Sequence, residues 1–233
     1  METNRLQGTV MRSQLIAVLA FSAAASAFAA APTPPSSTQI AAWSPEEINE
    51  QGPTIEKLLP VTLKGGEQAY LASVSYENAG RNFWAGYLLV RPEIGEVRPL
   101  EEFGGQYNQI RTLDDYSDSH SAVIIGGAGS GQGSSEASYA LVVFDGWSAK
   151  PLFTANESDN SGNCGAYVER DCEGNDVFIN VFEGDSTSKR IGLAVTNVKY
   201  RSPDIETTPY EYSHESQLVF VENPITNQRQ IRE

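Results

Sequence analysis

From Val61 onward, apolar and polar positions alternate with a period of two, and the apolar positions are rich in β-branched and aromatic residues. Gly, Pro, Asn and Asp interrupt this alternation at short intervals. Such a pattern is typical of half-buried β-strands that are joined by turns. It predicts three strand–turn–strand units, with turns at residues 91–95, 145–147 and 223–224.

Each of these units is preceded by two further apolar segments, so that the predicted strands fall into three groups of four. They are expected at 61–63, 70–76, 87–90 and 97–100, at 110–113, 122–126, 140–144 and 149–153, and at 177–182, 191–200, 217–221 and 228–231. We therefore expect an all-β protein of about three four-stranded antiparallel meanders that repeat about every 50 residues. Units of this kind suit a propeller-like arrangement and a β-sandwich equally, and the pattern does not choose between them.

One short helix is predicted ahead of the strands. Ser44, Pro45 and Glu47 match a capping box with proline at the first helical position, and Gly52-Pro53 ends the helix. The preceding residues 30–42 are rich in Pro, Ser and Ala and show no apolar period. We expect them to form a linker, so that a single β-rich domain covers residues 43–233.

Residues 1–29 have the pattern of a secretory signal peptide. Arg12 precedes an apolar run over residues 15–21, and small residues follow this run. Ala27-Phe28-Ala29 fits an A-x-A cleavage site, and Met11 is better placed as the initiator than the first residue. The alternative is an uncleaved membrane anchor, for which the apolar run is short. We therefore expect a periplasmic or secreted protein that is cleaved after Ala29 and has no stable membrane insertion afterwards.

Export also bears on the oxidation state of the two cysteines, Cys164 and Cys172. An oxidising compartment is expected to join them in a disulfide. Closing so short a loop stabilises a fold by about 2–3 kcal/mol on the chain-entropy model. The alternative is a metal site, but Zn²⁺ takes four ligands and both histidines lie far from the cysteines in sequence.

The composition adds a strong charge bias. The 233 residues include 16 Lys and Arg against 30 Asp and Glu, which gives a formal net charge of −14. So acidic a chain is repelled by phosphate backbones and by anionic lipid surfaces. We therefore expect no nucleic-acid partner.

Two acidic segments are candidates for metal binding. They comprise Asp114, Asp115 and Asp118 in one loop, and Asp171, Glu173 and Asp176 in another. Carboxylates gathered in loops are the ligands that Ca²⁺ prefers, and an exported protein meets this ion. The alternative is that both segments are solvated loops, which are expected in so acidic a chain. Ca²⁺ is the one cofactor that the sequence suggests.

The sequence carries no nucleotide-binding motif with the required spacing, and its S-x-x-K match at residues 186–189 falls in a predicted turn between strands, where no helical turn brings the serine and the lysine together. The glycine-rich segment 126–133 matches neither G-x-G-x-x-G nor a P-loop, and we expect it to be a flexible loop between strands. G-x-S-x-G is absent as well, and two histidines are the available bases for a nucleophile. We therefore assign no catalytic residue.

Aromatic residues outside the predicted strands are candidates for a contact surface. Trp147 lies in a predicted turn, where we expect it to be exposed, and Tyr210 and Tyr212 lie in a long predicted connection. An exposed ring on a β scaffold can stack on a sugar or anchor a protein partner. The sequence thus favours a non-catalytic binding or interaction module, whose partner is an unknown protein or glycan of the cell envelope. The open alternatives are an exported hydrolase that uses loop carboxylates and a structural component of the envelope.

Overall fold

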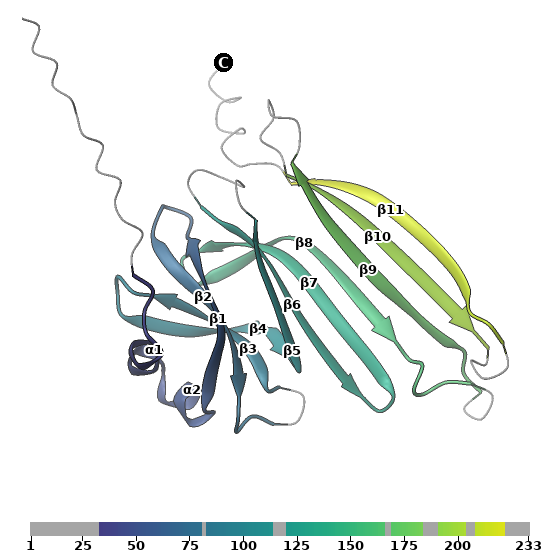
Figure 1. Cartoon of the computed structure of the whole chain (residues 1–233), viewed down its shortest axis with the longest axis horizontal. Coiled ribbons are helices and arrows are strands. Elements are labelled where there is room, and N and C mark those ends of the chain that lie inside the picture. Colours follow the sequence, from purple (N-terminus) through teal and green to yellow (C-terminus); the bar gives the residue numbers. More distant parts are fainter. Residues whose placement is uncertain are drawn as a thin grey trace, which may run out of the picture. The chain divides into compact units, whose positions relative to one another are not determined.

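The computed structural model describes residues 33–80, 83–113, 120–165, 169–183, 191–203 and 208–221. Within these residues the chain forms two antiparallel sheets and two short helices, which confirms the predicted all-β antiparallel fold (Figure 1). The first sheet is a meander of β1 (Pro53–Thr62), β2 (Gln68–Tyr76), β3 (Ala85–Arg91) and β4 (Glu96–Gly105). The second sheet is a longer meander of β5 (Tyr107–Leu113), β6 (Ala122–Gly131), β7 (Ser134–Asp145), β8 (Ser148–Asp159), β9 (Cys172–Glu183), β10 (Ile191–Ser202) and β11 (Glu211–Val221).

The three expected groups of four strands are therefore arranged as one four-stranded and one seven-stranded meander. The strand expected at 228–231, together with its turn at 223–224, lies outside the described residues. β1 begins at Pro53, ahead of the expected 61–63, and β11 begins at Glu211, ahead of the expected 217–221. Both are edge strands, which bury fewer side chains than central strands and so give a weaker alternation.

A shared apolar core lies between the first sheet and strands β5–β7. It is filled by alternate residues from both sheets, among them Leu71, Tyr87 and Leu89 from the first and Ile125, Val142 and Phe144 from the second. Because successive side chains of a strand point to opposite faces, these residues define the inner face of each sheet. The two sheets thus pack face to face as in a sandwich.

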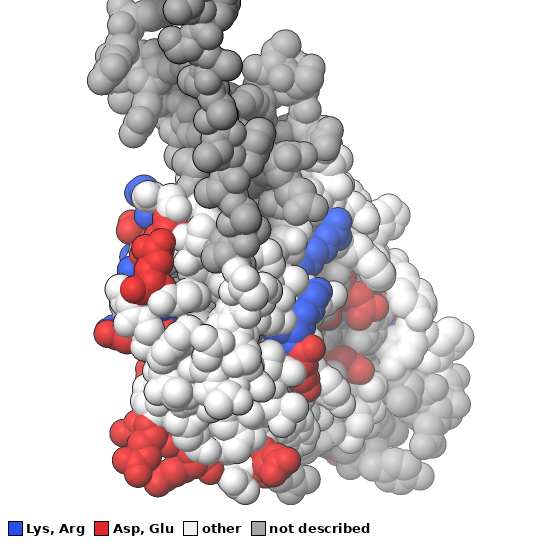
Figure 2. Space-filling view, turned by 60° about the vertical axis from the view of Figure 1, so that its left-hand side comes forward, with Lys and Arg blue, Asp and Glu red and all other residues white. Residues whose placement is uncertain are grey.

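The other face of the first sheet is covered by α1 (Ser37–Trp43) and α2 (Glu46–Glu50). Ile40 and Ile48 from these helices pack against a second set of buried residues, which includes Ala72, Val74 and Leu88. With both faces covered, β2 and β3 are buried along almost their whole length. This explains their nearly continuous apolar sequences. Figure 2 turns this side of the molecule forward and shows acidic side chains towards its left and lower margins, around a largely uncharged centre.

Two helices are present where the sequence predicted one. Ser36 is the N-cap of α1, and it forms a capping box with Gln39. Ser44, the expected N-cap of the next helix, instead donates its hydroxyl to the carbonyl oxygen of Ile40 at 2.8 Å, at the end of α1. α2 then begins after Pro45, which has no side chain that can cap. The predicted capping box at Ser44 is therefore wrong, because this serine ends one helix and does not begin the other.

The glycine-rich segment 126–133 is not the predicted loop, because most of it belongs to β6 and only residues 132–133 form the turn to β7. Close contacts explain why glycine occupies two positions of this segment. A Cβ atom on Gly127 would lie 2.2 Å from the carbonyl oxygen of Gly104 in β4. One on Gly126 would lie 2.8 Å from the ring of Tyr139. The missing side chain of Gly127 thus lets the two sheets approach each other closely, and that of Gly126 leaves room for the ring of its cross-strand partner Tyr139.

The second sheet divides after β8. Strands β8 and β9 pair only at Ser158–Asn175 and Asp159–Gly174, whereas β9, β10 and β11 pair with one another along their lengths. We call β9–β11 the arm (Figure 1). One face of the arm packs against the side of β5–β8 that faces away from the first sheet. This contact forms a further core, with Val177, Leu193 and Val195 from the arm and Ile124, Leu141 and Val143 from the rest of the sheet.

Candidate functional site

Of the two acidic segments, the structure describes only the second. The residues of the first acidic loop lie outside the described residues: Asp114, Asp115 and Asp118. In the second segment, Asp171 precedes β9, and its carboxylate accepts a hydrogen bond from Nε of Arg201 at 2.7 Å and another from the same guanidinium. Glu173 and Asp176 lie on β9 three positions apart, so their side chains point to opposite faces. No group of three or more His, Cys, Asp or Glu side chains in the described ranges could hold a metal ion.

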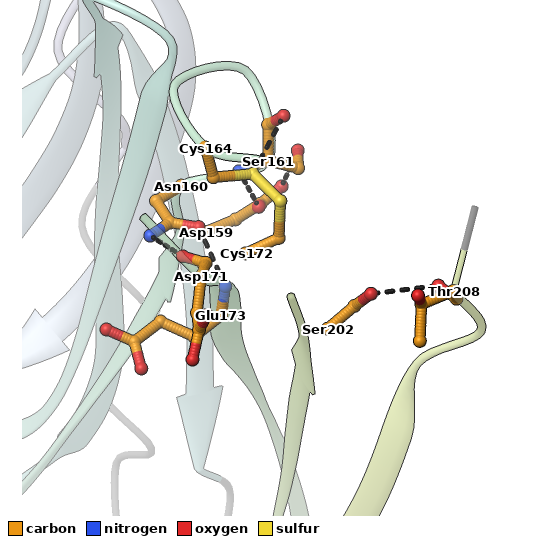
Figure 3. Close-up of a disulfide and its surroundings, with 9 residues drawn as sticks. All are labelled: Asp159, Asn160, Ser161, Cys164, Asp171, Cys172, Glu173, Ser202 and Thr208. Atoms are coloured by element: carbon orange, nitrogen blue, oxygen red, sulfur yellow. Dashed lines mark hydrogen bonds between the residues drawn. A yellow bond between two sulfur atoms is a disulfide. The ribbon is translucent and has the colours of Figure 1, made fainter. Parts of the chain in front are cut away.

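The predicted disulfide between Cys164 and Cys172 is present, with the two Cα atoms 4.9 Å apart (Figure 3). The side chain of Asn160 stabilises the loop that this disulfide closes. Its amide nitrogen donates to the carbonyl oxygen of Asp171 at 3.1 Å, and its amide oxygen accepts from the backbone N–H of Glu173 at 2.7 Å. We call residues 158–165 and 169–175 the disulfide corner. It fixes the junction between β8 and the arm.

Two further contacts near this corner involve β10 and the residues before β11. The ion pair between Arg201 and Asp171 joins β10 to the corner. The hydroxyl of Ser202, at the end of β10, donates to the carbonyl oxygen of Thr208 at 2.8 Å (Figure 3). Asp159 also accepts hydrogen bonds from the backbone N–H and the hydroxyl of Ser161, at 2.7 and 3.0 Å. Side chains from β10 and from the segment that precedes β9 thus hold this end of the arm.

Three tyrosines gather beside the disulfide corner, and we call Tyr200, Tyr210 and Tyr212 the tyrosine cluster. The ring centroids lie 5.3 Å apart for Tyr200 and Tyr210, 6.4 Å for Tyr200 and Tyr212, and 6.1 Å for Tyr210 and Tyr212. Gly174 makes room for the cluster, because a Cβ atom there would lie 2.3 Å from the hydroxyl of Tyr200. Tyr212 remains 70% exposed. The cluster is therefore a supported aromatic surface that is open to solvent.

Burial raises the pKa of Tyr200 to about 12, and the negative charges of Asp159 and Asp176 add to this effect. The phenol is therefore protonated at neutral pH and can donate a hydrogen bond. A hollow of about 530 Å³ lies at this end of the arm, and its lining includes Tyr200 and Tyr212. Glu173, Lys199 and Ser213 also line it, but the pairing register places their side chains on the opposite face from the two tyrosines. This end of the arm thus has an aromatic face on one side and charged and hydroxyl side chains on the other.

The sequence identified only part of this cluster. Tyr210 and Tyr212 were candidates, although Tyr212 lies on β11 and not in a connection. Tyr200 was missed because it is the last residue of an ordinary predicted strand, 191–200. The register brings them together, since Tyr200 of β10 is directly opposite Tyr212 of β11. That register cannot be read from either strand alone.

Trp147 lies in the turn between β7 and β8, as predicted, but its ring is partly buried against the core. The guanidinium carbons of Arg91 and Arg98 lie 4.7 and 4.5 Å from the ring centroid. Arg91 is itself held by two hydrogen bonds to the carboxylate of Glu67, at 2.7 and 2.5 Å. Trp147 was expected to be exposed and is half-buried. Its use as a contact surface stays a prediction.

The outer face of the arm carries further exposed apolar side chains that the sequence analysis did not single out. Phe178 is 54% exposed and Leu218 is 63% exposed. The pairing register places both on the same face as Tyr200 and Tyr212, opposite the face that packs against β5–β8. The signal is present in residues 177–182, where apolar residues occupy both faces of one strand. Exposed apolar residues on one face are typical of an interaction surface.

No protein-family model matches the chain, and searches of curated proteins and of solved structures returned no match. The role of the tyrosine cluster is therefore inferred from its geometry and its chemistry.

Proposed function

We propose that the protein is a non-catalytic binding module that contacts its partner with the tyrosine cluster at the end of the arm. The observation that supports this proposal is the exposure of Tyr212, which is 70% open to solvent although it touches two other aromatic rings. Removing apolar surface from water stabilises a complex by about 25 cal/mol per Å². Tyrosine is also enriched among the residues that dominate binding energies. A partner that covers this ring would gain both contributions.

The surroundings of the cluster support the same role. The disulfide and the contacts of Asn160 hold the backbone beneath the rings, so that less conformational freedom is lost on binding. The phenol of Tyr200 adds a hydrogen-bond donor on the same face as the ring of Tyr212. We propose a protein or a glycan of the cell envelope as the partner, because a tyrosine ring can pack on a sugar ring or on an apolar side chain.

We further propose that the protein acts in the periplasm or outside the cell, after cleavage behind Ala29. The disulfide between Cys164 and Cys172 supports this location, because such bonds persist in oxidising compartments. Among the helices of the described residues, none is long and apolar enough to cross a membrane.

Site-specific photo-cross-linking in intact cells tests the proposal. A benzophenone side chain replaces Tyr212 in one variant and Tyr107 in the other. Tyr107 is the matched control because it is 67% exposed but lies on β5, outside the tyrosine cluster. We expect a discrete adduct from position 212 alone, and digestion of that adduct with protease or glycosidase identifies the class of partner. The proposal fails if position 212 gives no adduct, or the same adducts as position 107.

A further inference from the structure

The outer edge of β11 has no neighbouring strand among the described residues (Figure 1). Its pairing with β10 runs from Glu211–Arg201 to Val221–Ile191 without a shift in register. All residues from 211 to 218 are exposed. In an antiparallel sheet, every second residue of an edge strand points its N–H and C=O groups away from its neighbour. β11 therefore presents a long row of backbone donors and acceptors to solvent.

The other three edge strands of the described sheets carry features that oppose pairing. β1 contains Pro53 and Pro60 and a register shift next to Lys57. β4 contains Pro99 and pairs with β3 through a register shift, and β5 is a seven-residue strand that carries Arg111. Proline, basic residues, bulges and short length all protect sheet edges against added strands. β11 is eleven residues long and has no proline, no Lys or Arg and no register shift.

The side chains of β11 indicate which kind of strand would fit. Glu211 and Glu215 lie on one face, four positions apart. Tyr212 and Leu218 lie on the other face and are 70% and 63% exposed. Directly opposite residues in an antiparallel pair stabilise it when they carry opposite charges or are both apolar. A complementary strand therefore has basic residues opposite the two glutamates and apolar residues opposite Tyr212 and Leu218.

We infer that β11 binds an extended segment of a partner polypeptide, which joins the arm as an added strand and alternates basic with apolar residues. The inference rests on the proposed function, since Tyr212 belongs to both surfaces, and it specifies a protein as the partner. Strand addition takes affinity from backbone hydrogen bonds and specificity from alternate side chains. Charge complementarity supports a basic segment, because the chain carries a net charge of −14.

Two other occupants of this edge fit its charges less well. A second copy of β11 would bring four glutamates onto one face of a joined sheet, and like charges oppose such pairing. The chain's own Arg229 and Arg232 are three positions apart. In an extended strand this odd spacing would put them on opposite faces, whereas Glu211 and Glu215 share one face. A partner segment with basic residues at even spacing matches both glutamates.

The test uses the whole protein and a synthetic 11-residue peptide in which lysine alternates with valine. Control peptides have glutamate in place of each lysine, or the same composition in two blocks. Fluorescence anisotropy measures the affinity, and hydrogen exchange measures the protection of the β11 amides. We expect the alternating peptide alone to protect β11. The E211K/E215K variant should bind it at least about tenfold more weakly. The E46K/E47K variant makes the same charge change on exposed positions of α2 and should bind within about twofold of the unmodified protein.

Four results would overturn the inference. Equal affinity of the E211K/E215K and E46K/E47K variants would show that the peptide responds to net charge alone. Protection of the outward β11 amides in the free monomer would show that the chain covers its own edge. Protection that rises with protein concentration would show pairing between copies. A glycan adduct at position 212 without peptide binding would overturn strand addition and leave the proposed function intact. Peptide protection of β11 without an adduct at position 212 would overturn the proposed function and leave strand addition intact.

Discussion

The hydroxyl of Tyr87 joins the two sheets, and its removal is expected to destabilise the fold. The side chain belongs to β3 and is 1% exposed. Its oxygen lies 2.7 Å from the carbonyl oxygen of Gln109 and 2.9 Å from the amide nitrogen of the same residue, on β5. The carbonyl oxygen and the N–H of Gly126, on β6, are also within hydrogen-bonding distance. One hydroxyl of the first sheet thus serves two neighbouring strands of the second.

The magnitude follows from the bonds that Tyr87→Phe would remove. The phenyl ring keeps its place in the core, so apolar packing changes little. The hydroxyl donates one proton and accepts from N–H groups, so at least one donated and one accepted bond are lost. A buried partner left without a bond costs about 1–3 kcal/mol. We therefore expect the free energy of unfolding to fall by about 2–3 kcal/mol. Burial raises the pKa of Tyr87 to about 12, so the loss should be constant around neutral pH.

Urea denaturation followed by tryptophan fluorescence and circular dichroism measures this change. Tyr107→Phe is the control, because it makes the same substitution at a side chain that is 67% exposed, and it should stay within about 0.5 kcal/mol of the unmodified protein. If Tyr87→Phe also stays within about 0.5 kcal/mol with an unchanged denaturant slope, the hydroxyl does not hold the sheets together. Apolar packing alone would then join them.

Two further predictions concern the arm and the pH dependence of stability. Replacing Cys164 and Cys172 together by serine should lower the free energy of unfolding by about 2–3 kcal/mol, and hydrogen exchange should rise in β9–β11. An equal rise in β1–β4 would contradict a local role of the disulfide. Burial, together with the charge of Lys64, lowers the pKa of His120, so below about pH 6.5 the unfolded chain binds a proton that the folded chain excludes. The free energy of unfolding should therefore fall as the pH drops below this value, and it should fall by less in the His120→Gln variant. Urea denaturation at several pH values measures both losses. Equal losses in the two proteins would refute the contribution of His120 to this pH dependence.

The strands of the central region could be predicted because burial of one face is a local property of the sequence. The turns expected at 91–95 and 145–147 join β3 to β4 and β7 to β8. The division into one sheet of four strands and one of seven could not be predicted in this way. It depends on contacts between distant segments, such as the close approach of Gly127 to Gly104. The alternation of side chains carries no information about such contacts.

The candidate site could likewise be predicted only where its structure depends on nearby residues in the sequence. The disulfide between Cys164 and Cys172 was predictable, because pairing two cysteines leaves no choice of connectivity. The acidic segment from Asp171 to Asp176 was expected to be a loop, but most of it is the beginning of β9. A strand directs successive side chains to opposite faces, so carboxylates that are close in sequence are separated in space. Tyr200 and Tyr212 are far apart in sequence and become neighbours through the register of β10 and β11.

The disulfide and the exposed face of the arm are both related to the limited core of the arm. The first sheet is buried on both faces, by the helices and by the second sheet. The arm buries one face only, and pairs with β8 at just two positions. A small unit with a limited core needs stabilisation from another source, and a disulfide provides it without covering any surface. A layer over the outer face would also stabilise the arm, but it would bury Phe178, Tyr212 and Leu218. The covalent bond at the root of the arm therefore stabilises it while this face stays open to solvent.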